Sequence, residues 1–153
     1  MKKNDVLILL VLLIIVFAFF LFNRSIDDRV NRFESCITDI GEMGISIVHI
    51  EYDITNIGSN FRVTSVSGSH TMELVNIDSG EVISSQGFYT QWDDLVGFNN
   101  GMTLSGVCNF NYDFQDGVTY YFRLVSDLDI DGSSYLVVSP LFSHVHSWYN
   151  GPM

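Results

Sequence analysis

The sequence predicts an all-β fold class: a single N-terminal transmembrane helix followed by a two-layer β-sandwich. Two observations support this prediction. Residues 6–22 form an uninterrupted apolar run, separated from Lys2 and Lys3 only by Asn4 and Asp5. From Gly44 onward, apolar and polar residues alternate in short segments separated by turn residues, which is the pattern of half-buried strands.

The apolar run of residues 6–22 (VLILLVLLIIVFAFFLF) contains no charge. As a helix it spans roughly 25 Å, the short end of what a bilayer core of about 30 Å requires. The end of the run and the two residues after it, residues 19–24 (FFLFNR), lack the small side chains that a signal peptidase needs. We therefore predict a retained signal-anchor in membrane lipid, preceded by a short cytoplasmic N-terminus at residues 1–5.

Charge distribution predicts the orientation and excludes one class of partner. Arginines follow the apolar run as lysines precede it, so the flanking charges alone are ambiguous. Residues 34–153 contain 15 acidic residues against Arg62 and Arg123, which gives 2 − 15 = −13. A body so poor in positive charge is readily exported, so we expect a single-pass protein with its C-terminal domain extracytoplasmic. The same charge excludes nucleic-acid binding, which needs a basic surface.

Residues 23–43 are predicted to form a juxtamembrane helical stalk. Ile26, Val30 and Phe33 recur at spacings of four and three, which gives one narrow apolar stripe on a helix. The stripe would contact a partner helix or cover the base of the domain that follows.

Residues 44–140 are predicted to form one domain of about seven short strands. Within the first strand, Val48, Ile50, Tyr52 and Ile54 share an apolar face. A longer, more polar connection is expected at residues 88–101. A tail that contains aromatic residues and histidines is expected at residues 141–153. The expected strands lie at residues 45–54, 61–66, 70–77, 81–85, 102–110, 118–126 and 135–138.

Seven alternating strands with turn signals every 8–15 residues indicate an immunoglobulin-like β-sandwich. Residues 52–59 (YDITNIGS), 100–101 (NG) and 116–120 (DGVTY) resemble the pattern of extracellular Ig-like modules on archaeal cell surfaces. Together with the anchor, the chain resembles archaellum stator-type proteins. The resemblance implies a sandwich tethered to the cytoplasmic membrane that binds the surface layer or other copies.

Two cysteines, Cys36 and Cys108, predict one disulfide, because an even number in an exported domain favours pairing. The bridge would close a loop of about 70 residues and contribute about 3–5 kcal/mol. The alternative is a pair of buried free thiols.

Asp127, Asp129 and Asp131, followed by Gly132, match the first half of a calcium-binding loop. The bidentate glutamate that normally completes such a loop is missing, because the twelfth position is Val138. The alternative is an Asp-Gly hairpin whose aspartates only keep an edge soluble.

His144 and His146 would face the same side of a strand, an arrangement that can hold zinc or copper. A blue-copper site is not supported, because no histidine follows Cys108 closely. The alternative is a pair of ordinary surface histidines.

The sequence has no nucleophile elbow, phosphate loop or paired-carboxylate motif, so we expect no enzymatic activity. The predicted function is a membrane-tethered structural or interaction subunit of a cell-surface or envelope assembly, acting through protein contacts or self-association. The alternative is an envelope protein that binds Ca²⁺ or, less favoured, copper. Aromatic and stripe residues are the candidate contacts: Ile26, Val30, Phe33, Trp92, Phe98, Phe142, Trp148 and Tyr149.

Overall fold

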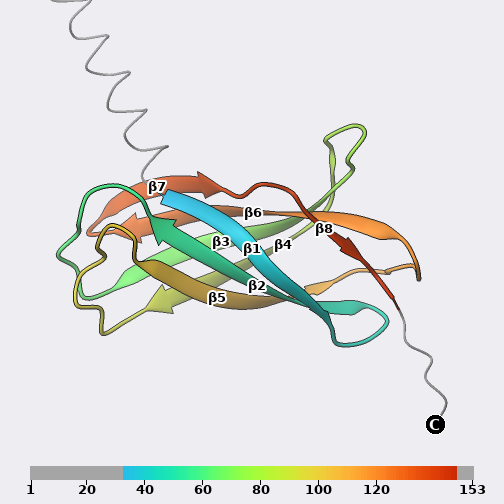
Figure 1. The fold of residues 1–153 in the computed structure, drawn as a ribbon, viewed down its shortest axis with the longest axis horizontal. Coiled ribbons are helices and arrows are strands. Elements are labelled where there is room, and N and C mark those ends of the chain that lie inside the picture. The colour runs from blue at the N-terminus through green and yellow to red at the C-terminus, as the bar shows by residue number, and fades with distance from the viewer. Residues whose placement is uncertain (1–32, 148–153) are drawn as a thin grey trace, which may run out of the picture.

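The computed structural model describes residues 33–147, which form an all-β domain of eight strands (Figure 1). In this range no helix is long and apolar enough to cross a membrane. The all-β prediction is confirmed for this part of the chain, and the predicted anchor lies outside it. The strands are β1 (Phe33–Glu42), β2 (Ile47–Asn56), β3 (Val66–Val75), β4 (Val82–Trp92), β5 (Thr103–Asn111), β6 (Thr119–Ile130), β7 (Ser133–Val138) and β8 (Phe142–Val145).

The strands form two antiparallel sheets that pack face to face. The smaller sheet has the order β1-β2-β5, and the larger has the order β4-β3-β6-β7. The short strand β8 pairs with β6 next to β7, so β7 and β8 are consecutive segments along one side of β6. Pro140 lies in the gap between them, where it has no backbone N–H to add to the ladder.

The core lies between the sheets and follows the period of two expected for strands. In β2, Val48, Ile50, Tyr52 and Ile54 are fully buried, as the sequence predicts. From the larger sheet, β6 contributes Phe122, Leu124, Leu128 and Ile130 to the same core, and Met72 and Leu74 of β3 lie beside them.

One close approach between neighbouring strands requires a glycine. Gly106 of β5 lies opposite Tyr52 of β2, and a Cβ at this position would be only 2.3 Å from the Tyr52 ring and hydroxyl. The buried Tyr52 ring therefore lies over Gly106, and its hydroxyl makes a 3.0 Å hydrogen bond with Thr90 Oγ1 of β4. This bond links the two sheets.

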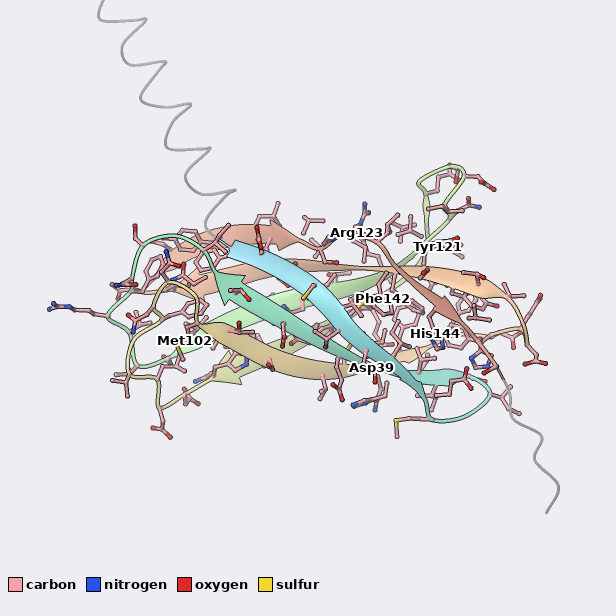
Figure 2. The ribbon with its side chains drawn as sticks, viewed as in Figure 1. Asp39, Met102, Tyr121, Arg123, Phe142 and His144 are labelled. Atoms are coloured by element: carbon pink, nitrogen blue, oxygen red, sulfur yellow. The ribbon has the colours of Figure 1, made fainter. Side chains whose placement is uncertain are left out.

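The domain has two ends, which we call the entry pole and the distal pole (Figure 1). The chain enters β1 at Phe33 at the entry pole, where the segments 57–65 and 93–102 and the turn at 131–132 also lie. The tips at 43–46, 76–81 and 112–118 lie at the distal pole, to which β8 also runs. Figure 2 places Met102 and His144 toward opposite ends of the domain.

Three predicted boundaries are wrong, and of the strand expected at residues 61–66 only Val66 lies in a strand, where it begins β3. Residues 33–42 of the expected helical stalk form β1, an edge strand of the smaller sheet. Residues 88–92 of the expected connection belong to β4, and residues 142–145 of the expected tail form β8. Each segment gains a ladder partner, because β1 pairs with β2, β4 with β3, and β8 with β6. The domain therefore begins before residue 44 and extends beyond residue 140.

Candidate functional site at the distal pole

The distal pole exposes large apolar side chains on several tips. Met43 and Ile45 in the β1–β2 turn are 63% and 57% exposed, and Ile77 and Val145 are more than half exposed. The tips are locally well ordered by hydrogen bonds. In the β3–β4 tip, the Asn76 side-chain oxygen accepts bonds from the backbone N–H groups of Asp78 and Ser79. The exposed apolar groups are therefore presented by fixed turns.

A cluster of one carboxylate and two imidazoles lies at the same pole. Glu42 ends β1, while His144 lies in β8 and His146 follows it directly. Glu42 Oε1 lies 3.5 Å from His144 Nε2 and 3.4 Å from His146 Nδ1. Among the described residues, this is the only group of three potential metal-ligand atoms within 4.8 Å of one another.

The surroundings hold this cluster in place. The backbone of His146 donates to Val118 O at 3.1 Å and accepts from Gly117 N at 2.8 Å. The Phe114 ring stacks on the His146 imidazole with ring centroids 5.1 Å apart. Glu42 is held by the residue after His146, because its Oε1 accepts a 2.5 Å bond from the backbone N–H of Ser147.

The sequence predicts the two histidines as a pair but not the carboxylate. Their spacing of two places both side chains on one side of β8, as expected. Glu42 lies about a hundred residues away and in the segment predicted as a helical stalk. Nothing in the sequence pattern connects it with the histidines.

The three aspartates of the predicted calcium loop do not form such a cluster. Asp131 and Gly132 form the β6–β7 turn with positive φ values of 54° and 73°, as in a tight two-residue hairpin. Asp129 Oδ1 accepts a 3.0 Å bond from Gly132 N, and Asp127 accepts a bond from the Ser134 hydroxyl. The loop is therefore a tight hairpin in which Asp127 and Asp129 accept local hydrogen bonds, and calcium binding there stays a prediction.

The predicted disulfide is wrong in this structure, because both cysteines are free. Cys36 lies opposite Asp53 of β2, and Cys108 lies opposite Ile50. Positions 50 and 53 of one strand face opposite sides of the sheet, so one thiol faces the core and the other faces outward. Burial raises the pKa of the Cys108 thiol to about 12. The pKa of the Cys36 thiol is also raised, by partial desolvation and then by the Asp53 carboxylate.

We therefore expect the two thiols to differ in reactivity without any reductant. A maleimide should label one thiol in the folded protein and the second only after denaturation, because Cys36 is exposed and Cys108 is buried. Mass spectrometry of the labelled chain measures this, and Cys36→Ser should remove the early label. If both positions react only after a reductant is added, the cysteines form the disulfide after all.

The other two histidines, His49 and His70, each make a hydrogen bond to a side chain of the domain. His49 lies on the outer face of β2 and makes a 2.9 Å hydrogen bond with the Asn109 side chain. His70 is 2% exposed, and its Nδ1 lies 2.8 Å from Ser126 Oγ. The rings of Tyr52, Phe88 and Trp92 surround it. Burial lowers the pKa of His70 to about 4, so it is neutral at neutral pH.

The predicted contact residues divide into three groups. Phe33 and Phe98 are buried and stack on each other, so their prediction as interface residues is wrong. Trp92 and Phe142 pack partly buried against the core, and the Trp92 indole N–H donates to Ser105 O. The other four, Ile26, Val30, Trp148 and Tyr149, lie outside the described residues.

No family model matches this chain, and no curated protein matches it. A structure described as ApaA from Bordetella pertussis is similar over 76% of this chain and 96% of that chain, with 12% identity and a TM-score of 0.46. A structure described as a β-galactosidase from Bacteroides fragilis matches 73% of this chain but 16% of its own length, with 12% identity and a TM-score of 0.38. A glycoside hydrolase family 2 β-glucuronidase matches 73% of this chain and 11% of its own length, also with 12% identity and a TM-score of 0.38. These values are too low to assign a family or an activity.

Proposed function

We propose that this chain is a non-enzymatic, membrane-tethered interaction subunit that presents its distal pole to protein partners of a cell-surface or envelope assembly. The observation that carries the proposal is the position of three exposed apolar side chains relative to the entry of the chain, although Ile57 and Val96 at the entry pole are exposed as well. The chain enters at Phe33, at the pole opposite to the exposed side chains of Met43, Ile45 and Ile77.

The length of the connecting segment supports this orientation. Residues 23–32 separate the predicted anchor from Phe33, and ten residues span at most about 35 Å. The entry pole is thereby kept close to the bilayer, while the distal pole is directed away from it. Apolar groups on hydrogen-bonded turns are suited to contact another protein, because little loop entropy remains to be lost on binding.

The acidic body supports placing the domain outside the cytoplasm. Glu34 to Met153 contains 15 acidic residues and two arginines, so little positive charge opposes export.

The type of sandwich and the resemblance to a protein family belong to the same proposal. The sheet orders β1-β2-β5 and β4-β3-β6-β7 support an immunoglobulin-like sandwich, corresponding to A-B-E and C′-C-F-G strands. A tethered sandwich of this kind agrees with the resemblance to archaellum stator-type proteins.

A photo-crosslinking amino acid at the distal pole tests the partner surface. Placed at Ile45 in the full chain in its own membrane, it should give one discrete product, whose mass distinguishes self-association from a second protein. The same group at Ser59 on the entry pole should give none.

A charge substitution tests whether that product reflects binding. Ile45→Asp should abolish the product formed by a crosslinker at Met43. The matched control is Val107→Asp, because Val107 is also 57% exposed but lies on β5, away from the tips. Crosslinking that is equal at both poles, absent at both, or equally sensitive to the two aspartates would contradict the proposal.

The cation-binding alternative is favoured by one observation, the Glu42, His144 and His146 cluster. It differs from the predicted calcium site in place and in chemistry, since imidazole nitrogens suit transition metals rather than calcium.

A further inference from the structure

Two buried imidazole nitrogens at the distal pole have no hydrogen-bond partner. They are Nε2 of His144 and Nδ1 of His146, and the His146 side chain is only 1% exposed. A buried polar atom without a partner costs roughly 1–3 kcal/mol, so such atoms need a reason. Both nitrogens face the same carboxylate oxygen of Glu42.

An ion pair explains this geometry poorly. Charge-assisted N–H···O bonds are about 2.7–2.9 Å long. The two nitrogens instead lie 3.5 and 3.4 Å from Glu42 Oε1, and neither makes a hydrogen bond to it. The three atoms surround a point without bonding to one another.

The spacing suits a metal ion at that point. Zinc bonds to histidine nitrogen and carboxylate oxygen are about 2.0–2.2 Å long, so tetrahedral ligand atoms lie roughly 3.3–3.6 Å apart. The two measured distances of 3.5 and 3.4 Å fall in this range. The third separation, between the two histidine nitrogens, is within 4.8 Å. One small adjustment would therefore complete a three-ligand face.

We propose that Glu42, His144 and His146 bind one divalent transition-metal ion, with zinc the best match to the ligand set. Two imidazoles and one carboxylate form a known zinc ligand combination, and a solvent molecule would take the fourth position. The hydrogen bonds to the His146 backbone and to Glu42 Oε1, together with the Phe114 ring, hold the ligands in position before the metal arrives.

The position of the site gives the ion a structural role. Glu42 belongs to β1 of the smaller sheet, while the histidines belong to or follow β8, which pairs with the larger sheet. The metal would therefore clamp the two sheets together at the distal pole. It would also hold β8, a four-residue strand that pairs with β6 over Thr119 to Phe122.

Zinc titration of the full, untagged chain in detergent micelles tests the proposal. After treatment with a chelator, the protein should bind one Zn²⁺ per chain by isothermal titration calorimetry, and its melting temperature should rise with Zn²⁺. Co²⁺ should give the intense visible absorption of a four-coordinate ion, and Zn²⁺ should remove this absorption.

Glu42→Gln and His144→Gln should each weaken zinc binding more than about tenfold, since even the loss of a supporting residue around a metal costs 10–100-fold. Neither side chain is in the apolar core, so both variants should fold. His49→Gln and Glu51→Gln are the matched controls, because they remove a histidine and an acid elsewhere. Absence of zinc binding at tens of micromolar, or equal binding by all four variants, would overturn the proposal. A metal-free domain that still crosslinks at Ile45 would overturn the site but not the proposed function.

Discussion

Gly106→Ala is expected to destabilise the domain by about 1–3 kcal/mol, the usual range when a group is added to a well-packed core. The new methyl carbon would lie 2.3 Å from the ring and hydroxyl of Tyr52, which is fully buried and cannot move aside without opening the core. Displacing the ring also breaks the hydrogen bond between the Tyr52 hydroxyl and Thr90. Urea unfolding of the two proteins measures the difference.

Gly41→Ala is the matched control for this substitution. Gly41 also lies in the smaller sheet, but a Cβ there meets no atom within 4 Å. Because glycine loses more backbone entropy on folding than alanine, Gly41→Ala should be neutral or slightly stabilising. Equal effects of the two substitutions would show that Tyr52 does not pack over Gly106 as described.

Acidification is expected to remove up to about 3 kcal/mol of stability through His70 alone. The pKa of His70 is lowered to about 4 in the folded domain, whereas an unperturbed histidine has a pKa of about 6.5. Between these values only the unfolded chain binds the proton. The stability is therefore complete above about pH 6.5 and is lost as the pH falls toward 4.

The comparison with His70→Gln isolates this contribution from those of the other histidines. The difference in unfolding free energy between wild type and variant should shrink by about 3 kcal/mol from about pH 7.5 to about pH 4. Urea unfolding at several pH values measures it. A difference that stays constant with pH would mean that the His70 ring is accessible to water in the folded protein.

Most of the strands could be predicted because both of their faces follow a clean alternation. In β2, the buried side chains and the polar ones alternate without a break, and the two-residue turn at Asp131 and Gly132 is similarly local. These features depend on short-range sequence alone.

Strand β1 lies in the segment that was predicted as a helical stalk from the spacing of Ile26, Val30 and Phe33. A β-bulge gives the strand itself a similar apolar spacing, so the sequence does not correct that prediction. The buried apolar residues of β1 are Phe33, Ile37 and Ile40, and the register of pairing with β2 shifts between Ile37 and Asp39. The extra residue moves the apolar face from odd to even positions, which produces spacings of four and three. Those are also the spacings of a helix face.

The sequence predicts a strand at residues 81–85, which is too short for β4, for a different reason. Its inward positions include Ser84, Gln86 and Thr90, and they are only partly buried because β4 is an edge strand. Polar residues on both faces give no alternation to detect. The hairpin pairing with β3, across the tip at residues 76–81, determines this strand.

The site depended on long-range register that the sequence does not display. The disulfide prediction counted cysteines correctly but could not know that positions opposite Ile50 and Asp53 lie on different faces. The same is true of Glu42, which reaches His144 and His146 only because β1 packs beside β8.

Labelling of intact cells tests the tethered orientation most directly. The protein to use carries Cys36→Ser and Ile45→Cys, so that the one exposed thiol in residues 33–147 lies on the distal pole. In cells that make this protein, a membrane-impermeant maleimide should label it before lysis, and the labelled chain should remain in the membrane fraction after a high-salt wash. Labelling only after lysis, or recovery of the chain in the soluble fraction, would contradict the account.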